Sequence, residues 1–416
     1  MSKVIITHPS GNENTRAAVR GFHDAGLLHT FIVSVAVYPR SSYYRLLSLP
    51  GLSEFKKRML PDNLHPYVKC YPYKEIVRRL CDKLHIRSLT AHEVGTFSSW
   101  KGCRYIDDKA AMFLRKHAAE DVAAVYCYED VALATFEEAK RQKKLCLYDL
   151  PIPYWRYFHK LLEDEAKKKP EWAATLKGLQ DSEGKLKMKD EELRLADRIY
   201  VASTFTKRSL EMYPGATLAP IEVIPYGFPA AKTDRQYDDI SGRKIRLLCV
   251  GGLTQQKGIG YIFEALEGLG DIFELSFIGG GDIDRCPALA ENLKKWKYLG
   301  TMPHPAVLNT MAQNDILIFA SLFDGFGLVV TEAMSQGTPV IATDRTCGPD
   351  IITNGYDGWI IEAGSAKAIR DKLLYLSNHR DEITTAGKHC LGTAAKRPWS
   401  VYERELAGSV ANAIGS

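Results

Sequence analysis

Short apolar runs alternate with amphipathic segments along most of the chain. In the first half, six such runs have the length and β-branched content of buried strands. These predicted strands cover residues 4–7, 29–35, 122–127, 145–148, 198–202 and 221–224. The second half repeats the rhythm, with predicted strands at 245–250, 275–278, 315–320 and from Pro339 onward. Strands that alternate with helices indicate parallel sheets, so we expect an α/β protein.

The stretch from Asp324 to Ala342 is the most informative part of this pattern. A glycine-bearing turn, Gly325-Phe326-Gly327, separates a predicted strand from an amphipathic helix that begins near Leu328. Glycines let the backbone approach a bound group, and the first N–H groups of a helix have no partner within it, which suits a phosphate. Glu332 follows Asp324 by eight residues. Two carboxylates at one cleft would accept hydrogen bonds from the hydroxyls of a sugar or ribose.

This segment resembles the acidic-x7-Glu signature of the retaining nucleotide-sugar glycosyltransferases, family 4, which share the two-domain GT-B fold. That family usually has Glu at the first position, where this chain has Asp324. The resemblance implies that Asp324 orients the donor sugar and that Glu332 binds the nucleotide ribose. It also implies donor contacts from the turn and the helix start: Gly325, Phe326, Gly327, Leu328 and Val329. The alternative is a Gly-Phe-Gly turn that serves packing only.

A second glycine loop, residues 251–258, follows the first predicted strand of the second half. It is not a P-loop, because Lys257 lacks a following Ser or Thr at the required spacing. It resembles the family's Gly-Arg-Leu-x-x-x-Lys-Gly loop, with Gly252 where arginine is usual. Lys257 would then be a third catalytic residue that pairs with the donor diphosphate, a contact worth about 1.5 to 3 kcal/mol. The other predicted donor-binding residues are Gly11, Asn12, Gly251, Gly252, Gly280 and Leu299.

The acceptor is expected at the strand ends of the first half. Glu129 and Asp130 follow one predicted strand and Asp149 ends the next. The carboxyl ends of parallel strands converge on the ligand crevice, so these three carboxylates are candidates for binding an acceptor hydroxyl. Asp282-x-Asp284 resembles a metal-binding pair, but it follows a glycine run that relatives have without metal. We therefore expect no metal and no cofactor beyond a nucleotide-sugar donor, with a UDP- or GDP-sugar favoured.

Charge is distributed unevenly along the 416 residues. Residues 1–220 hold 36 Lys and Arg against 27 acidic residues, whereas residues 221–416 hold 19 against 23. The basic half suggests an anionic partner such as a membrane surface or a polyanionic glycan, or simply a solvated surface. Tyr43–Leu60 and Glu75–Leu84 are basic and partly amphipathic, so they are either membrane-contacting segments or ordinary helices with a wet basic side. Glu163–Glu192 is rich in charge and predicts exposed helices.

Nine single cysteines are scattered without a Cys-x-x-Cys pair, which favours reduced thiols and a cytoplasmic protein. The chain enters a predicted strand at Val4, so we expect no signal peptide, and no apolar run approaches the length of a membrane span. The protein is therefore expected either free in the cytoplasm or as a peripheral protein at the cytoplasmic face of an anionic membrane, with no nucleic-acid partner.

The resemblance and the strand pattern together predict two Rossmann-like, doubly wound domains that face a cleft. The predicted divisions are an acceptor domain at 1–228, a linker at 229–243, a nucleotide-sugar domain at 244–398 and a helix at 399–416 that returns to the first domain. The implied function is a metal-independent, retaining hexosyltransferase. It would move a sugar from a nucleotide-sugar to a hydroxyl of a glycan or lipid-linked acceptor in surface polysaccharide or lipopolysaccharide synthesis. Two alternatives stay open: another GT-B enzyme such as an epimerase or phosphorylase, and a catalytically silent sugar-binding or scaffold subunit.

Overall fold

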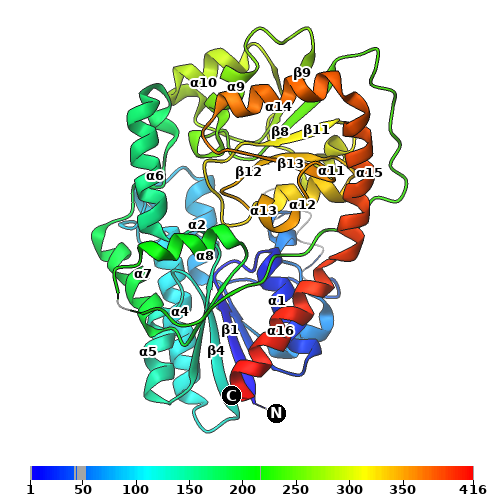
Figure 1. Cartoon of the computed structure of the whole chain (residues 1–416). Helices are drawn as coiled ribbons and strands as arrows, with labels where there is room; N and C mark the ends of the chain where they lie inside the picture. The colour runs from blue at the N-terminus through cyan, green and yellow to red at the C-terminus, as the bar shows by residue number, and fades with distance from the viewer. Residues whose placement is uncertain (1, 42–43, 45–52, 216, 416) are drawn as a thin grey trace.

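The computed structural model describes residues 2–41, 44, 53–215 and 217–415, and two parallel sheets form its framework (Figure 1). The first sheet has seven strands in the order β3-β2-β1-β4-β5-β6-β7. Its strands are β1 (Lys3–His8), β2 (Leu28–Val33), β3 (Val68–Cys70), β4 (Val122–Tyr128), β5 (Leu145–Leu150), β6 (Arg198–Val201) and β7 (Ile221–Val223). The order reverses beside β1, so the loops after β1 and β4 flank the crevice of this sheet.

Helices cover both faces of the first sheet because alternate strand residues point to opposite sides. Val4 and Ile6 belong to a core that includes α1 (Glu13–Asp24) and α16 (Trp399–Gly415). Ile5 belongs to a separate core with α4 (Ser99–Lys116) and α5 (Leu133–Arg141). A β-strand buried on both faces needs a continuous apolar run, which is the pattern that predicted β1, β4 and β5.

The second sheet has six strands in the order β10-β9-β8-β11-β12-β13. They are β8 (Ile245–Val250), β9 (Phe273–Ile278), β10 (Lys297–Tyr298), β11 (Ile316–Phe319), β12 (Val340–Thr343) and β13 (Gly358–Ile361). One face packs on α9 (Ile259–Ala265) and α14 (Ala366–Asn378), and the other on α12 (Leu328–Ser335) and α15 (Arg380–Lys396). The remaining helices of this half are α10 (Pro287–Leu293), α11 (His304–Met311) and α13 (Gly348–Ile351).

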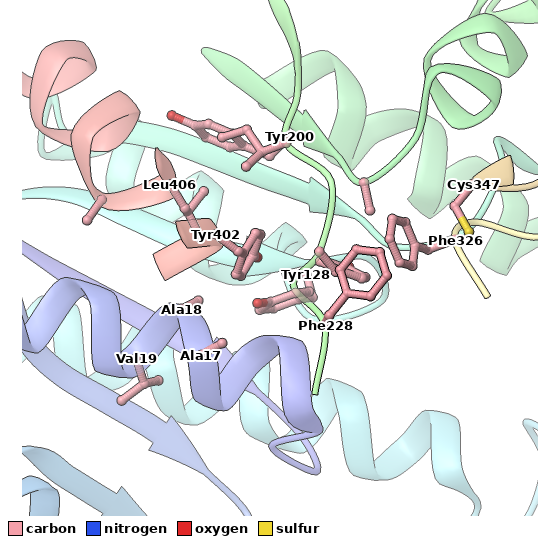
Figure 2. Packing of buried hydrophobic residues seen from close by; sticks show 14 of the residues in the cluster. Ala17, Ala18, Val19, Tyr128, Tyr200, Phe228, Phe326, Cys347, Tyr402 and Leu406 are labelled. Carbon is pink, nitrogen blue, oxygen red and sulfur yellow. The ribbon is translucent and has the colours of Figure 1, made fainter. Parts of the chain in front are cut away.

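The last helix joins the two halves of the molecule. Residues 229–243 contain no helix or strand, and α15 leads directly into α16, which lies beside α1 at the bottom of Figure 1. Arg20 on α1 pairs with Glu403 at 2.8 Å, and a Cβ on Gly21 would meet the Glu403 carbonyl oxygen at 2.5 Å. Figure 2 shows Tyr402 and Leu406 of α16 above Ala17 and Ala18 of α1. The end of the chain therefore completes the core of the first domain.

The prediction of exposed helices at Glu163–Glu192 is partly wrong. This segment contains the end of α6 (Trp155–Lys168) and most of α7 (Glu183–Leu195), but Lys189 and Glu192 are buried. Lys189 forms an ion pair and Glu192 accepts a hydrogen bond, both with the loop after β4. Because these partners compensate their charges, the two residues are buried although they are charged. Tyr43 and residues 45–52 of the Tyr43–Leu60 prediction lie outside the described residues. Among the described helices, none is long and apolar enough to span a membrane.

Candidate functional site

A cavity of about 800 Å³ lies between the two domains, next to the carboxyl ends of the strands. The first domain contributes the loop after β1 and basic side chains from three segments, and the second domain contributes α11 and α12. Its lining is Ser10, Gly11, Asn12, Glu13, Arg16, Lys57, Arg58, Arg79, Pro229, His304, Leu328, Thr331, Glu332 and Trp399. A larger cavity of about 960 Å³ lies around Phe263, Leu266 and Trp296 of the second domain and Trp172 of the first, and its lining includes no residue of the loop 251–258 or the turn 325–327. The interdomain cavity is therefore the candidate site.

The glycine loop after β1 is held rigidly at the cavity. Gly11 has φ of 61°, and the Nδ1 atom of His8 accepts the backbone N–H groups of Ser10 at 3.0 Å and Gly11 at 2.8 Å. Burial, with a smaller contribution from Arg58, lowers the pKa of His8 to about 3, so the ring stays neutral and can accept both bonds. Asn12 caps α1 by accepting the N–H of Thr15 at 3.2 Å. The structure thus brings Gly11 and Asn12 to the cleft.

The turn before α12 places Leu328 and Glu332 on the opposite wall. Gly327 has φ of 94°, and a Cβ there would meet the Phe319 ring at 2.5 Å, so glycine is required. The first N–H groups of α12 have no acceptor within the helix, and Leu328 at its start lines the cavity. The carboxylate of Glu332 is 2.9 Å from Nε2 of His304, and this hydrogen bond raises the pKa of His304. His304 gave no sequence signal, because a single histidine at a helix start is common.

Lys257 and Asp324 form an ion pair with each other beside this wall. Their loops touch because Gly258 comes so close to β11 that a Cβ would lie 2.0 Å from the Ala320 carbonyl oxygen. The Lys257 ammonium also lies over the Phe319 ring, 5.3 Å from its centroid. Both charged side chains are largely buried, and neither is among the described residues that line the cavity. The structure therefore brings the first two predicted catalytic residues together and sets Glu332 apart, against His304.

Backbone contacts gather the other predicted donor residues of the second domain. The N–H of Gly251 donates to Ile278 at 2.9 Å, and the N–H of Leu253 donates to Gly280 at 2.8 Å. Leu299 donates to Phe277 at 2.9 Å, which places the loop after β10 next to that after β9. A Cβ on Gly252 would lie 3.8 Å from the Thr254 methyl carbon, an ordinary van der Waals contact, so a side chain would fit there. The loops lie together at the carboxyl ends of β8, β9 and β10, but these four predicted residues are not among the described residues that line the cavity.

The turn at Gly325 and Phe326 contacts the first domain directly. The Gly325 carbonyl accepts hydrogen bonds from the hydroxyls of Ser203 at 2.7 Å and Thr206 at 3.1 Å. A Cβ on Gly325 would lie 1.9 Å from the Pro151 carbonyl oxygen. The rings of Phe326 and Tyr226 pack with centroids 4.9 Å apart, and Figure 2 shows Phe326 beside Phe228 at this junction. The turn therefore contacts both domains.

The three predicted acceptor carboxylates are not brought to the cleft. Glu129 is buried against Lys189 at 3.2 Å, and Asp149 is 3% exposed and accepts the Tyr126 hydroxyl at 2.6 Å. Asp130, with φ of 72°, forms the turn that starts the connection to α5 and faces Lys185 at 3.6 Å. Burial raises the pKa of both Glu129 and Asp149 to about 7. Strand-end position predicted contact with ligand, but these carboxylates contact other side chains of the first domain instead.

Basic side chains occupy the first-domain wall where the acceptor was expected. They are Arg16, Lys57, Arg58 and Arg79. The sequence signal was present in the basic run at 56–58 and in the amphipathic segment 75–84, which we interpreted as possible membrane contacts. The pattern could not indicate which basic side chains turn inward, because that depends on how η2 (Ser53–Arg58) and α2 (Tyr73–Lys83) pack.

One group of side chains has spacing suitable for a metal ion. The ligand atoms of His92, Glu93 and Asp181 all lie within 4.8 Å of one another, on exposed or half-buried residues outside the cavity lining. Each already has a protein partner, since Asp181 binds Lys185 at 2.9 Å and Glu93 accepts from Ser182 at 2.8 Å. Asp282 pairs with Lys177 at 2.7 Å. Protein cations and donors therefore occupy these carboxylates.

Known proteins resemble part of this chain in sequence. Residues 231–389 match the family Glycosyl transferases group 1. The amylovoran biosynthesis glycosyltransferase AmsK of Erwinia amylovora is 29% identical over 182 residues, which are 41% of this chain and 45% of AmsK. The matched segment thus spans less than half the length of that relative.

Solved structures resemble the whole chain. HepE of Anabaena in complex with UDP has a TM-score of 0.62 at 13% identity, over 99% of this chain and 100% of HepE. The same protein with UDP-glucose has a TM-score of 0.61 at 14% identity, with the same coverage. The lipopolysaccharide outer core galactosyltransferase WaaB has a TM-score of 0.60 at 16% identity, over 99% of each chain. At such identities the likeness concerns the fold, and the predicted two-domain α/β fold is confirmed.

Proposed function

Because the second half of this chain belongs to the glycosyl transferases group 1 and the whole chain has the GT-B fold, we propose that the protein is a retaining glycosyltransferase. It moves a sugar from a nucleotide-sugar to a hydroxyl of a glycan or lipid-linked acceptor. The biosynthetic role of AmsK and the galactosyltransferase WaaB support surface polysaccharide or lipopolysaccharide synthesis. The UDP and UDP-glucose bound by HepE favour a UDP-sugar as donor.

The observation that carries the proposal is the ion pair of Lys257 with Asp324 beside the turn before α12, together with Glu332 of α12 in the cavity lining. The leaving diphosphate gains negative charge as the bond to the anomeric carbon breaks. Lys257 and the first N–H groups of α12 stabilise that charge. Asp324 holds the ammonium of Lys257 until the donor binds and then orients the donor sugar. Glu332, held by His304, binds the ribose.

The acceptor hydroxyl attacks from the first-domain side and on the face from which the diphosphate departs, so configuration is retained. The leaving phosphate takes the proton of the hydroxyl, which dispenses with a separate base. No step assigned to these residues uses a metal ion. The contacts of Gly325 with Ser203 and Thr206 support a mechanism in which donor binding and domain closure are coupled, because closure excludes water from the reacting centre.

An exposed apolar stripe on α2 supports action at a membrane surface. Tyr73, Ile76, Leu80 and Leu84 recur at helical spacing and are each more than half exposed. Lys83 beside them is exposed as well. Apolar side chains flanked by basic ones suit the interface of an anionic membrane. The free thiols of all nine cysteines support a reducing compartment, so we place the reaction at the cytoplasmic face.

The test is a thermal-shift and hydrolysis screen with UDP-, GDP-, dTDP- and ADP-sugars in the presence of EDTA. We expect stabilisation by one nucleotide class and slow release of its diphosphate. Lys257→Ala should reduce turnover by about a hundredfold or more, as expected for loss of a group that stabilises transition-state charge. Lys367→Ala, which removes a lysine paired with Asp371 on the exposed α14, is the matched control and should have no effect. A protein that binds a nucleotide-sugar but never turns it over would instead be a silent sugar-binding subunit.

A further inference from the structure

The first-domain wall of the cavity is strongly basic. Of the side chains it contributes, four are cations and only Glu13 is an anion. Glu13 is already engaged by Arg16, and by Arg20 at 3.3 Å. The remaining cations, Lys57, Arg58 and Arg79, come from η2 and α2, two segments distant in sequence that meet at this wall. A neutral sugar acceptor gives no reason to gather three cations at one place.

Arg58 is the central residue of this wall. It is 9% exposed, yet its guanidinium nitrogen Nη1 is buried and, within the described residues, has no hydrogen-bond partner. Its other terminal nitrogen binds Glu75, a carboxylate that also accepts from Arg78 at 2.9 Å and Arg79 at 3.0 Å. Arg78 has a second partner in Asp82 at 3.1 Å, whereas Nη1 of Arg58 has none among the described residues. A buried guanidinium N–H without an acceptor is unfavourable, so an anionic ligand oxygen would stabilise it.

The space beside Arg58 is suited to such a ligand. Arg58 lines both the main cavity and an adjoining hollow of about 140 Å³. Arg79 and Ser10 line both as well, and Ser34 and Tyr71 add hydroxyl groups to the hollow. Guanidinium forks and hydroxyls are the groups that bind phosphate oxygens with two or more hydrogen bonds. In the proposed function the donor diphosphate lies at the start of α12 on the opposite wall, with Lys257 beside that wall, so this is a separate site.

We infer that Arg58, Arg79 and Lys57 form a subsite for a phosphate or diphosphate group carried by the acceptor. The inference rests on the proposed function, since it names the chemical class of the acceptor in the same cleft. The group comes either from a lipid phosphate or from a soluble sugar phosphate, and both present the same oxygens to the arginines. Of the fifteen exposed large apolar side chains among the described residues, seven lie between residues 73 and 94, so a lipid source has a surface at hand.

The test measures the binding of inorganic pyrophosphate by calorimetry. Saturating UDP is present, so that the donor site is already filled. We expect the Lys57→Gln/Arg79→Gln double variant to bind pyrophosphate at least tenfold more weakly than the wild type. The matched control is Lys116→Gln/Lys143→Gln, which removes two exposed cations of the first domain outside the cavity lining and should bind as the wild type does. Both variants should keep the thermal shift with UDP. Arg58→Lys, which keeps the charge but loses the fork, should weaken binding severalfold.

The outcomes separate the subsite from the proposed function. Equal pyrophosphate affinity in the double variant and the control overturns the subsite, while a normal UDP response leaves the transferase proposal standing. A parallel loss of UDP and pyrophosphate binding in the double variant also overturns it, because the cations would then serve the donor. No nucleotide response in the wild type overturns the proposed function itself. Uronate-bearing acceptors used as readily as phosphorylated ones in transfer assays would overturn the choice of phosphate.

Two further arms identify the source of the phosphate. Phosphatidylcholine vesicles with a tenth of phosphatidic acid should bind the wild type, and the double variant should bind them more weakly, if the group is lipid-borne. Glycerol phosphate and glucose 1-phosphate should compete with pyrophosphate, without any vesicle binding, if the group is soluble. Either result supports the subsite, and a wild type that binds neither the vesicles nor any of these phosphate compounds, pyrophosphate included, overturns it.

Discussion

Asp149 offers a direct test of the difference between a structural carboxylate and an acceptor-binding one. The carboxyl group is buried between β4 and β6 and accepts the Tyr126 hydroxyl at 2.6 Å. Burial raises its pKa from 3.8 to about 7, and the hydrogen bond from Tyr126 offsets only part of that effect. The folded state therefore holds a proton on Asp149 over a pH range in which the unfolded chain has released it.

The sign and size of the effect follow from this shift. A folded-state pKa above the unfolded value means that Asp149 stabilises the protein less as pH rises from about 4 to about 7. Between pH 5 and pH 8 about two pKa units of the shift are titrated, which corresponds to roughly 3 kcal/mol at 1.36 kcal/mol per unit. Asp149→Asn keeps an acceptor for Tyr126 and removes the ionisation. The variant should match the wild type near pH 5 and exceed its free energy of unfolding by about that amount at pH 8.

Urea denaturation at pH 5, 6, 7 and 8 measures the difference in free energy of unfolding between Asp149→Asn and the wild type. Hydrogen exchange of β4 and β5 assigns the transition to the first domain. Asp371→Asn, which removes an exposed carboxylate of α14 in the second domain, is the matched control. A pH-independent difference between Asp149→Asn and the wild type would refute the reasoning. A variant of normal stability that loses transfer activity would show instead that Asp149 contacts the acceptor.

Two further predictions concern the walls of the cleft. Gly325→Ala should lower the thermal midpoint and weaken nucleotide binding, because its Cβ would lie 1.9 Å from the Pro151 carbonyl and overpacking of this kind costs about 1 to 3 kcal/mol. Gly242→Ala, with nothing within 4 Å, is its control, and equal melting of the two variants would contradict the argument. NMR titration should give His304 a pKa above 6.5, because Glu332 stabilises the protonated ring, and the ion pair is lost as pH rises through that pKa. The pKa of His304 should fall in Glu332→Gln. The same His304 pKa in the variant and the wild type would mean that the pair is absent in solution.

Most of the framework could be predicted from periodicity because buried parallel strands need continuous apolar runs. β1, β4, β5 and β8 are such runs, and the predicted positions agree with the structure to within one or two residues. β3 (Val68–Cys70) was missed because it is a short, largely exposed edge strand that needs few apolar residues. The turn at 325–327 and the helix from Leu328 were also predicted, because a left-handed glycine and an apolar helix leave local signals.

The candidate site could be predicted only where its residues lie on local backbone motifs. Lys257, Asp324, Glu332 and the glycines occupy loops whose sequence defines their position, so a resemblance could identify them. Glu129 and Asp149 lie at strand ends as expected, yet the direction of their side chains depends on Lys189 and Tyr126, which approach from other segments. For Arg58 and Arg79, the sequence showed that the segments are basic but not that these side chains line the cavity.

The sequence by itself determined the order of strands and helices, the two glycine-rich turns and the carboxylates of the second domain. These features depend on backbone propensity and on residues close in the chain. Only the tertiary structure decided which charges are buried, that α16 completes the core of the first domain, and that Arg58 meets Arg79 at the cleft wall. The physical reason is that the free energy of a charged side chain depends on its solvent exposure and on partners distant in sequence, and chain folding alone establishes both.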